Sequence, residues 1–303
     1  MLRPSGSWVA IPTPFDSNNQ IDFGVFKAIV DFHAVHGTSA LLVMGSAGET
    51  TLLSLDEKKR IIRELAPYSK GRVPIFFGTT CPTTDDTVRL SQFAEAEGAD
   101  GVLFTVPPYI TPPQPAVYEF LKTAISSVRI PAAIYNNPTR VHVNIEPDTI
   151  VRLSEECENF VADKEAMPNV SQIAEVLSRT NKRLHVLCCD YPGYGLIMPT
   201  LALGGHGAAN IGGNLIPEEM AAMAKPWSSF EDVTRSRELY FKYLPLLKLL
   251  YTVTNPVMIK AGYRLLGFPV GFPRKPLPDA MPEKFEELKR LMDELGVIAK
   301  YKR

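Results

Sequence analysis

Residues 73–106 read Val73-Pro-Ile-Phe-Phe-Gly78, then an amphipathic segment from Thr83 to Gly98, and then Gly101-Val-Leu-Phe-Thr-Val106. The two outer runs are apolar throughout, which is typical of strands that are covered on both faces. The segment between them is long enough for a crossover helix. This order predicts two neighbouring parallel strands joined by a helix.

The same alternation recurs along the chain in both directions from this unit. Eight short apolar runs are present, at residues 8–14, 40–44, 73–78, 101–106, 131–135, 160–166, 184–189 and 207–211. Amphipathic segments lie between them, at residues 22–36, 54–68, 83–98, 115–128, 147–154, 170–179 and 193–203. Eight strand–helix units in about 225 residues predict a (β/α)8 TIM barrel. A doubly wound sheet is disfavoured, because no glycine-rich dinucleotide loop follows the first run.

The pattern changes near Pro226, after which only helical segments follow. They lie at residues 233–252, 256–266 and 283–295, and a proline-rich stretch at 267–282 separates the last two. We therefore expect a barrel domain over residues 1–225 and a C-terminal helical region over 226–303. This region would pack on the barrel or on a neighbouring subunit.

The composition excludes several classes of protein. The chain has 303 residues, of which 45% are hydrophobic and 21% charged, as in a globular protein with a large core. Its 32 basic and 33 acidic residues give a net charge of −1, without the basic excess that nucleic-acid binding requires. No apolar stretch reaches the length of a membrane span, and the N-terminus does not resemble a signal peptide. We expect a cytoplasmic protein without nucleic-acid or membrane partners.

The cysteines and histidines show no metal-ligand spacing. The four cysteines are expected to be buried thiols, which fits a reducing compartment. The five histidines are scattered and do not form a pair four residues apart on a helix. No metal site is expected.

Groups that react in such a barrel lie at the carboxyl ends of the strands. Gly45-Ser46-Ala47-Gly48-Glu49 directly follows the second apolar run. Its small residues allow backbone N–H groups to face an anion such as a carboxylate. An ordinary tight turn is the alternative.

Two further segments place phenols at strand ends. Pro107-Pro108-Tyr109 follows the fourth run, and Tyr135-Asn-Asn-Pro-Thr-Arg140 ends the fifth. Tyr135 would lie inside the barrel mouth, with Arg140 just beyond it and suited to binding a carboxylate through two parallel hydrogen bonds. The alternatives are a surface tyrosine at 109, and a structural tyrosine with a solvated arginine.

The sixth run, Phe160-Val-Ala-Asp-Lys-Glu-Ala166, is the most informative. Strand alternation places Lys164 on the face opposite Asp163 and Glu165, pointing into the barrel. Lysine is seldom buried without a function, and desolvation favours its neutral amine, which is a nucleophile toward carbonyl carbon. A side chain that extends to solvent is the alternative for Lys164.

Together these motifs resemble the dihydrodipicolinate synthase / N-acetylneuraminate lyase family. The resemblance rests on the segments already quoted, on Leu203-Gly-Gly-His-Gly207 before the eighth run, and on Asn255-Pro256 with Lys260 in the tail. They occur in the family's order and spacing over nearly the whole chain.

The resemblance implies a role for each site residue. Lys164 would form a Schiff base with pyruvate or another 2-oxo acid, without any external cofactor. Tyr135 would transfer protons through Ser46 and through Tyr109 of an adjacent subunit, in a homotetramer built as a dimer of dimers. Ser46 and Ala47 would bind the substrate carboxylate, and Arg140 the carboxylate of a second substrate. Gly45 and Ala209 would complete the substrate-binding set.

The resemblance also implies a reaction, condensation of pyruvate with an aldehyde as in a dihydrodipicolinate synthase. Two alternatives stay open. One is an aldolase, dehydratase or deaminase that acts on a 2-keto-3-deoxy sugar acid or a hydroxylated cyclic imino acid. The other is a non-catalytic paralogue that only binds a 2-oxo acid.

Some positions depart from the family pattern. Ala47 replaces a usual threonine, which removes one carboxylate-binding hydroxyl, and Asp163 replaces a usual aliphatic residue. Cys188-Cys-Asp-Tyr191 stands where synthases often have Gly-Asp-Asp, which adds bulk near the pocket. Leu55 and Lys58 stand where lysine-inhibited members have histidines, so we expect no lysine inhibition of that type.

Overall fold

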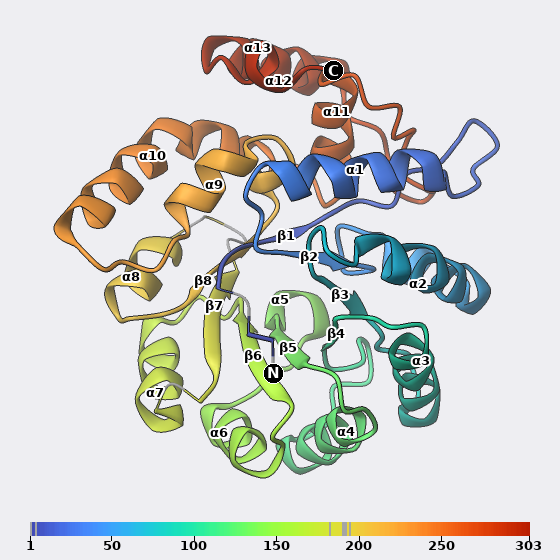
Figure 1. The fold of residues 1–303 in the computed structure, drawn as a ribbon, viewed down its shortest axis with the longest axis vertical. Helices are drawn as coiled ribbons and strands as arrows, with labels where there is room; N and C mark the ends of the chain where they lie inside the picture. The colour runs from blue at the N-terminus through green and yellow to red at the C-terminus, as the bar shows by residue number, and fades with distance from the viewer. Residues whose placement is uncertain (1, 4, 182, 190–192, 194) are drawn as a thin grey trace.

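Eight parallel strands form a closed barrel in the order β1 to β8 (Figure 1), and β8 pairs with β1 to close it. The computed structural model describes residues 2–3, 5–181, 183–189, 193 and 195–303. All eight predicted runs contain strands, which confirms the (β/α)8 barrel. The strands are β1 (Gly6–Ala10), β2 (Ala40–Val43), β3 (Ile75–Gly78), β4 (Gly101–Phe104), β5 (Ala132–Asn136), β6 (Phe160–Glu165), β7 (His185–Cys189) and β8 (Gly207–Asn210).

A ring of helices surrounds the barrel (Figure 1). Each of the seven predicted amphipathic segments contains one of them, although residue 194 of the last segment lies outside the described residues. The ring consists of α1 (Phe23–Val35), α2 (Leu55–Ser69), α3 (Thr84–Ala96), α4 (Gln114–Ser126), α6 (Pro147–Glu156), α7 (Val170–Thr180), α8 (Ile197–Ala202) and α9 (Pro217–Met223). Four short elements of the barrel region were not predicted: η1 (Thr50–Leu52), α5 (Pro138–Val141), η2 (Gly212–Asn214) and α9.

Aromatic side chains fill the interior of the barrel. The rings of Trp8 and Phe76 lie 4.7 Å apart between their centroids, and both residues are fully buried. Gly101 pairs with Phe76 across β3 and β4, and a Cβ atom at Gly101 would lie 2.4 Å from the Phe76 ring. Large and small residues therefore alternate around the interior, which leaves space for a ligand only toward the mouth.

The helix after β2 begins at a well-defined residue. The Ser54 hydroxyl accepts a hydrogen bond from the Glu57 amide at 3.2 Å, and the Glu57 carboxylate accepts one from the Ser54 amide at 2.8 Å. This reciprocal pair fixes the start of α2 directly after the glycine-rich turn. The segment between the glycine-rich turn and α2 therefore has a fixed end at Ser54.

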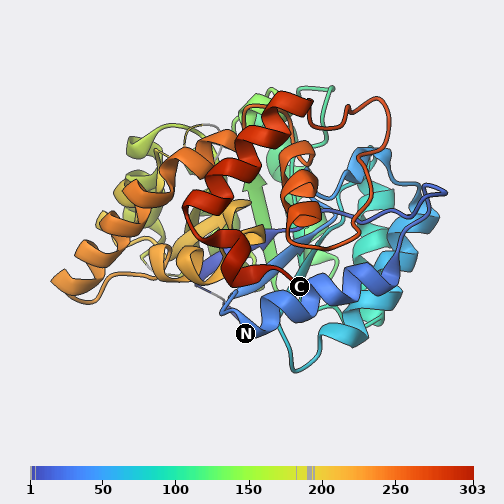
Figure 2. The same ribbon diagram turned by 90° about the horizontal axis from the view of Figure 1, so that it is seen from above.

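The chain after the barrel is helical, as the sequence predicted. It forms α10 (Phe230–Leu249), α11 (Val257–Leu265), α12 (Pro282–Glu294) and the unpredicted α13 (Val297–Tyr301). Figure 2 shows these helices along one side of the barrel, where α10 contacts α9, and α12 contacts both α10 and α11. The Tyr263 hydroxyl in α11 lies 3.1 Å from His33 of α1 and donates to Asn214 at 3.0 Å. The division at residue 226 stays a prediction.

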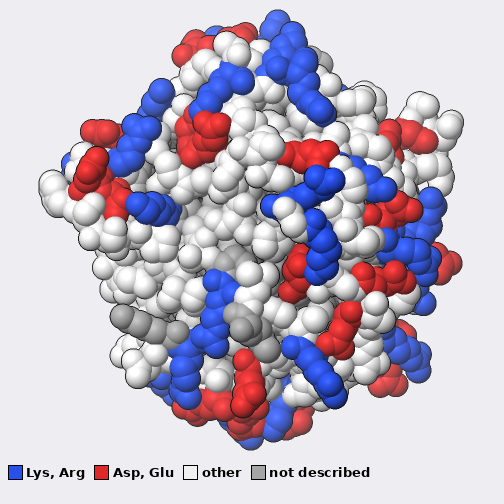
Figure 3. Space-filling view, viewed as in Figure 1, with Lys and Arg blue, Asp and Glu red and all other residues white. Residues whose placement is uncertain are grey.

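The face in Figure 3 carries both signs of charge around its rim and is mostly uncharged at its centre. All four cysteines are buried, and none forms a disulfide. Within the described part of the chain, no helix combines the length and apolarity needed to cross a bilayer.

Candidate active site

A cavity of about 780 Å³ opens at the carboxyl ends of β2 to β5. Residues from the turn after β2, from the starts of the next loops and from the C-terminal tail share its wall. Among the predicted site residues it is lined by Gly45, Ser46, Tyr135 and Arg140; among the others, by Glu49, Thr50, Lys58, Thr80, Cys81, Thr105, Asn137, Asn255, Pro276 and Leu277.

The glycine-rich turn presents unused backbone donors. Its internal hydrogen bonds use the amides of Gly48, Glu49 and Thr50, at 3.0 to 3.3 Å. The Thr13 hydroxyl donates to the Gly48 carbonyl at 2.8 Å and holds the turn against β1. No hydrogen bond described for this part of the chain uses the amide of Ser46 or Ala47, although Ala47 is fully buried. Two unused amides in a sheltered turn suit an anionic ligand.

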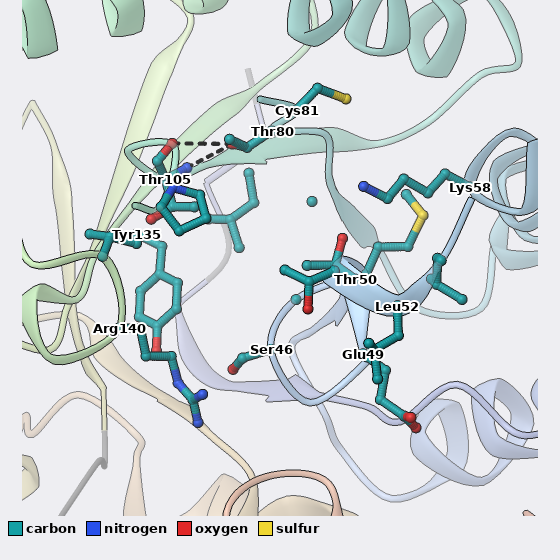
Figure 4. A pocket seen from close by; sticks show the side chains of 18 of the residues that line it. Ser46, Glu49, Thr50, Leu52, Lys58, Thr80, Cys81, Thr105, Tyr135 and Arg140 are labelled. Atoms are coloured by element: carbon teal, nitrogen blue, oxygen red, sulfur yellow. Dashed lines mark hydrogen bonds between the residues drawn. The ribbon is translucent and has the colours of Figure 1, made fainter. Parts of the chain in front are cut away.

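Tyr135 ends β5 on the interior face of the barrel. Its hydroxyl oxygen accepts a hydrogen bond from the side-chain amide of Asn137 at 2.5 Å and lies 3.7 Å from the Cys189 sulfur. Burial raises the pKa of Tyr135 well above its usual value, and the nearby Cys189 acts in the same direction. The phenol is therefore protonated near neutral pH. None of the described hydrogen bonds joins it to Ser46, which faces it across the cavity (Figure 4).

Lys164 lies directly beside Tyr135. The two residues are register partners on β6 and β5, and the Lys164 ammonium lies 4.0 Å from the centroid of the Tyr135 ring. Lys164 is only 5% exposed and is not among the residues that line the cavity, although its register partner Tyr135 is. Ala209 on β8 pairs with Cys189 and with Trp8, which places it on the same interior face. The prediction that Lys164 points into the barrel is consistent with this contact.

Arg140 lies on the short helix α5, which follows Asn137. In Figure 4 its side chain runs alongside Tyr135 and ends in the cavity near Ser46. Its positive charge lowers the pKa of Tyr135, against the larger effect of burial.

Tyr109 is not brought to the other predicted residues within one chain. It is 94% exposed and adopts a φ of +82°, a left-handed conformation that is uncommon for a residue other than glycine. Pro108 before it lines the cavity, but Tyr109 itself does not. The loop after β4 therefore directs the phenol outward.

Asp163 and Glu165 lie on the outer face of β6, as alternation predicted. The Glu165 carboxylate accepts hydrogen bonds from Met167, Asn136 and Gln172 at 2.6, 3.0 and 2.9 Å. Burial nevertheless raises the pKa of Glu165 to about 7. Asp163 is fully buried, and neither of its carboxyl oxygens has a hydrogen-bond partner in the described structure. Burial, and then the charge of Glu165, raise the pKa of Asp163 well above its usual value.

Several cavity residues were not predicted as part of the site. Asn137 belongs to the segment 135–140, which was quoted only for Tyr135 and Arg140. Its position two residues after Tyr135, on the same side of the strand end, was the signal that could have identified it. Cys189 was expected only to add bulk, whereas its sulfur contacts the phenol; Asp190 and Tyr191 of that segment lie outside the described residues. Asn255 of the tail was quoted only as part of the family resemblance, and the structure shows that it lines the cavity.

The model of the dihydrodipicolinate synthetase family matches residues 3–295. The chain belongs to this family. Among its relatives is a protein from Aquifex aeolicus (strain VF5) named 4-hydroxy-tetrahydrodipicolinate synthase. It is 34% identical over 296 residues, which cover 97% of this chain and 99% of the relative.

Two solved structures of family members have closely similar folds. One, described as the first monomeric dihydrodipicolinate synthase variant, has a TM-score of 0.90 at 30% identity and is covered over 97% of each chain. The other is a chloride-inhibited dihydrodipicolinate synthase from Acinetobacter baumannii complexed with pyruvate. It has a TM-score of 0.89 at 27% identity, with 97% of this chain and 99% of that chain covered.

No group of three or more His, Cys, Asp or Glu side chains that could hold a metal ion occurs among the residues that the structure describes.

The Lys58 side chain is buried and lines the same cavity as Tyr135, and burial lowers the pKa of Lys58. The absence of inhibition by lysine stays a prediction for this family member.

The raised pKa of Asp163 predicts a pH dependence of stability in this family member. An unfolded aspartate loses its proton near pH 4, whereas the folded protein retains it to higher pH. Folding then takes up a proton, so the free energy of unfolding falls as pH rises above about 4, by up to about 1.4 kcal/mol per pH unit. Asp163→Asn should remove this contribution, as measured by denaturant titrations at pH 5 and pH 8.

Asp148→Asn is the matched control, because Asp148 is exposed and paired with Arg179 on the surface. It should leave the pH dependence of unfolding as in the unmodified protein. Identical slopes for Asp163→Asn and the unmodified protein would contradict a protonated Asp163.

Proposed function

We propose that this family member is a Schiff-base-forming lyase or synthase in which Lys164 condenses with pyruvate and the product adds to an aldehyde. The contact between the Lys164 ammonium and the Tyr135 ring carries the proposal. It places a potential nucleophile beside a protonated phenol, at the mouth of a barrel with a ligand-sized cavity.

The chemistry follows from an amine next to a carbonyl. The neutral Lys164 amine attacks C2 of pyruvate to give a carbinolamine, which loses water to form an iminium ion. The iminium withdraws electrons from C3, so C3 loses a proton and an enamine forms. The enamine carbon attacks the aldehyde carbon, the aldehyde oxygen takes up a proton, and the iminium forms again. Water, or the amino group of the second substrate, then attacks the iminium carbon and displaces Lys164.

The turn after β2 supplies the carboxylate site. We assign the unused amides of Ser46 and Ala47 to the pyruvate carboxylate, which would fix C2 near Lys164. Gly45 and Ala209 would contribute space for the ligand, because neither has a side chain beyond Cβ. Ala47 has no hydroxyl to offer, so its contribution would come from the backbone alone.

Tyr135 would act as the proton donor and acceptor. Its phenol would protonate the leaving hydroxyl of the carbinolamine and later recover that proton. We propose that Ser46 of the same chain and Tyr109 of the partner subunit complete a relay to solvent. The exposed Tyr109 of each chain is directed away from its own cavity. This arrangement fits a homotetramer built as a dimer of dimers, in the cytoplasm, where buried thiols stay reduced.

Arg140 is assigned to the carboxylate of the second substrate. Aspartate semialdehyde, as in a 4-hydroxy-tetrahydrodipicolinate synthase, is the aldehyde that we propose. The assay is incubation with pyruvate and aspartate semialdehyde, followed through a coupled reductase. Failure of this reaction together with cleavage of a 2-keto-3-deoxy acid would replace the synthase by the aldolase.

Lys164→Ala is expected to abolish covalent trapping of pyruvate by borohydride, because it removes the nucleophilic amine. Mass spectrometry of the trapped protein should find the added mass on the peptide containing Lys164. Lys58→Ala is the matched control, since Lys58 is also buried and, unlike Lys164, directly lines the cavity. Trapping that persists in Lys164→Ala, or is lost only in Lys58→Ala, would refute the assignment.

Tyr135→Phe is expected to slow turnover by roughly 10²–10⁴-fold, the usual effect of losing a proton-transfer group. Steady-state kinetics at saturating pyruvate would measure it. Tyr118→Phe removes a buried phenol on α4 that bonds to Glu156 outside the barrel, and should leave turnover nearly unchanged. Equal rates for Tyr135→Phe and the unmodified enzyme would rule out the proton-transfer role.

A relay through the partner's Tyr109 predicts complementation between two inactive variants. Tyr109→Phe and Lys164→Ala are each expected to have low activity. In a mixed dimer, the site that keeps Lys164 receives Tyr109 from the other subunit, so activity should return after subunit exchange. No recovery in verified mixed oligomers would show that Tyr109 does not act across the interface.

A further inference from the structure

A fully buried ion pair joins the glycine-rich turn to the C-terminal tail. The Lys260 ammonium lies 2.7 Å from the Glu49 carboxylate, and both side chains are wholly inaccessible to solvent. Glu49 closes the turn after β2, whereas Lys260 belongs to α11 of the tail. The pair therefore connects segments that are more than two hundred residues apart in the sequence.

The remaining polar atoms of the pair are also engaged. Lys260 donates to the carbonyl of Phe272 at 3.0 Å, and the amide of Arg274 donates to the other Glu49 oxygen at 2.7 Å. The Lys260 ammonium and the Arg274 guanidinium each lie 4.2 Å from the centroid of the Phe15 ring. Glu49 is thus held from two points on the tail, over an aromatic ring from the loop after β1.

The conformation of Glu49 itself sets the direction of this contact. This residue adopts a φ of +57°, a left-handed conformation that is uncommon for glutamate. Its carboxylate points away from the cavity, while Ser46 on the same turn faces the cavity (Figure 4). Glu49 therefore contacts the tail with its side chain while its backbone closes the turn that presents the Ser46 and Ala47 amides.

Stability alone is a weak explanation for such a pair. Desolvation of two charges offsets much of their attraction, and apolar residues of similar volume often stabilise a fold as well or better. Constraint on geometry is the better-supported use of a buried, hydrogen-bonded pair at a turn that must keep two amides in place.

We propose that the Glu49–Lys260 pair positions the substrate-binding turn, so that the C-terminal tail controls affinity for the 2-oxo acid carboxylate. This inference rests on the proposed function and adds to it a link between the tail and substrate binding. Glu49 and Lys260 are positioning residues, because neither is placed against the reacting atoms.

The test is the dependence of imine trapping and turnover on pyruvate concentration in Glu49→Gln/Lys260→Met. This double variant removes both charges, so no unpaired charge is left in the core. We expect half-saturation to require about 10-fold or more pyruvate, because small displacements of positioning groups have effects of this size or larger. Turnover at saturation should fall by a smaller factor than the affinity, because Lys164 and Tyr135 are unaltered and only Ser46 of the proposed relay lies on the displaced turn.

Asp279→Asn is the matched control, since it breaks another ion pair of α11, with Arg264, that does not contact the turn. It should keep the half-saturation of the unmodified enzyme. If the double variant does not fold, Glu49→Gln alone decides. Its amide oxygen still accepts from Arg274, and Lys260, whose pKa burial lowers to about 8, can lose its proton once the carboxylate is gone while it still contacts the Phe272 carbonyl.

Each outcome bears on one proposal. A folded variant with unchanged half-saturation, in an enzyme that traps pyruvate, overturns the positioning role and leaves the proposed function intact. Equal losses of affinity and saturated turnover also overturn it, because a general structural defect would produce them. Absence of trapping in the unmodified enzyme overturns the proposed function and this inference with it.

Discussion

The packing of the Lys164 ammonium against the face of the Tyr135 ring is the contact on which the site depends. It exists because β5 and β6 pair with these two residues in register, on the interior face of the barrel. Lys164 is only 5% exposed, and a cation–aromatic contact is stronger when water is excluded, so the ring holds the protonated side chain in place until it loses its proton for the proposed reaction. One register therefore sets burial, orientation and the distance between the two groups.

The strands that carry this contact are supported from behind by polar groups. Asn136 follows Tyr135 and donates to Glu165, which follows Lys164, so a hydrogen bond on the outer face joins the same two strands next to the reactive pair. Gln172 of α7 donates to the same carboxylate and ties the helix to the sheet. Asp163, one residue before Lys164, has no such partners, and burial keeps its carboxyl group neutral instead.

The sequence predicts the barrel well because each strand and helix leaves a local signal. Apolar runs, helical periodicity and the positions just after strand ends are all short-range properties, and they were sufficient to single out Tyr135 and Lys164. The contacts of Cys189 with Tyr135, and of Lys260 with Glu49, join distant segments and leave no local pattern. Tyr109 was singled out by its motif, and within one chain its phenol is exposed, so the contacts proposed for it cannot be read from a single chain.

The C-terminal tail contributes to the cavity, although its secondary structure differs from that of the barrel. Only helices follow β8, and the predicted division near residue 226 falls between two of them, α9 and α10. Yet Asn255, Pro276 and Leu277 line the same cavity as Ser46 and Tyr135, and Lys260 reaches the turn that borders it. A barrel cut at residue 225 would keep Lys164 and Tyr135 but lose part of the cavity wall and the partner of a buried carboxylate. Without the tail, Glu49 would lose both the Lys260 ammonium and the Arg274 amide, so the turn after β2 would be held mainly by its internal hydrogen bonds and by Thr13.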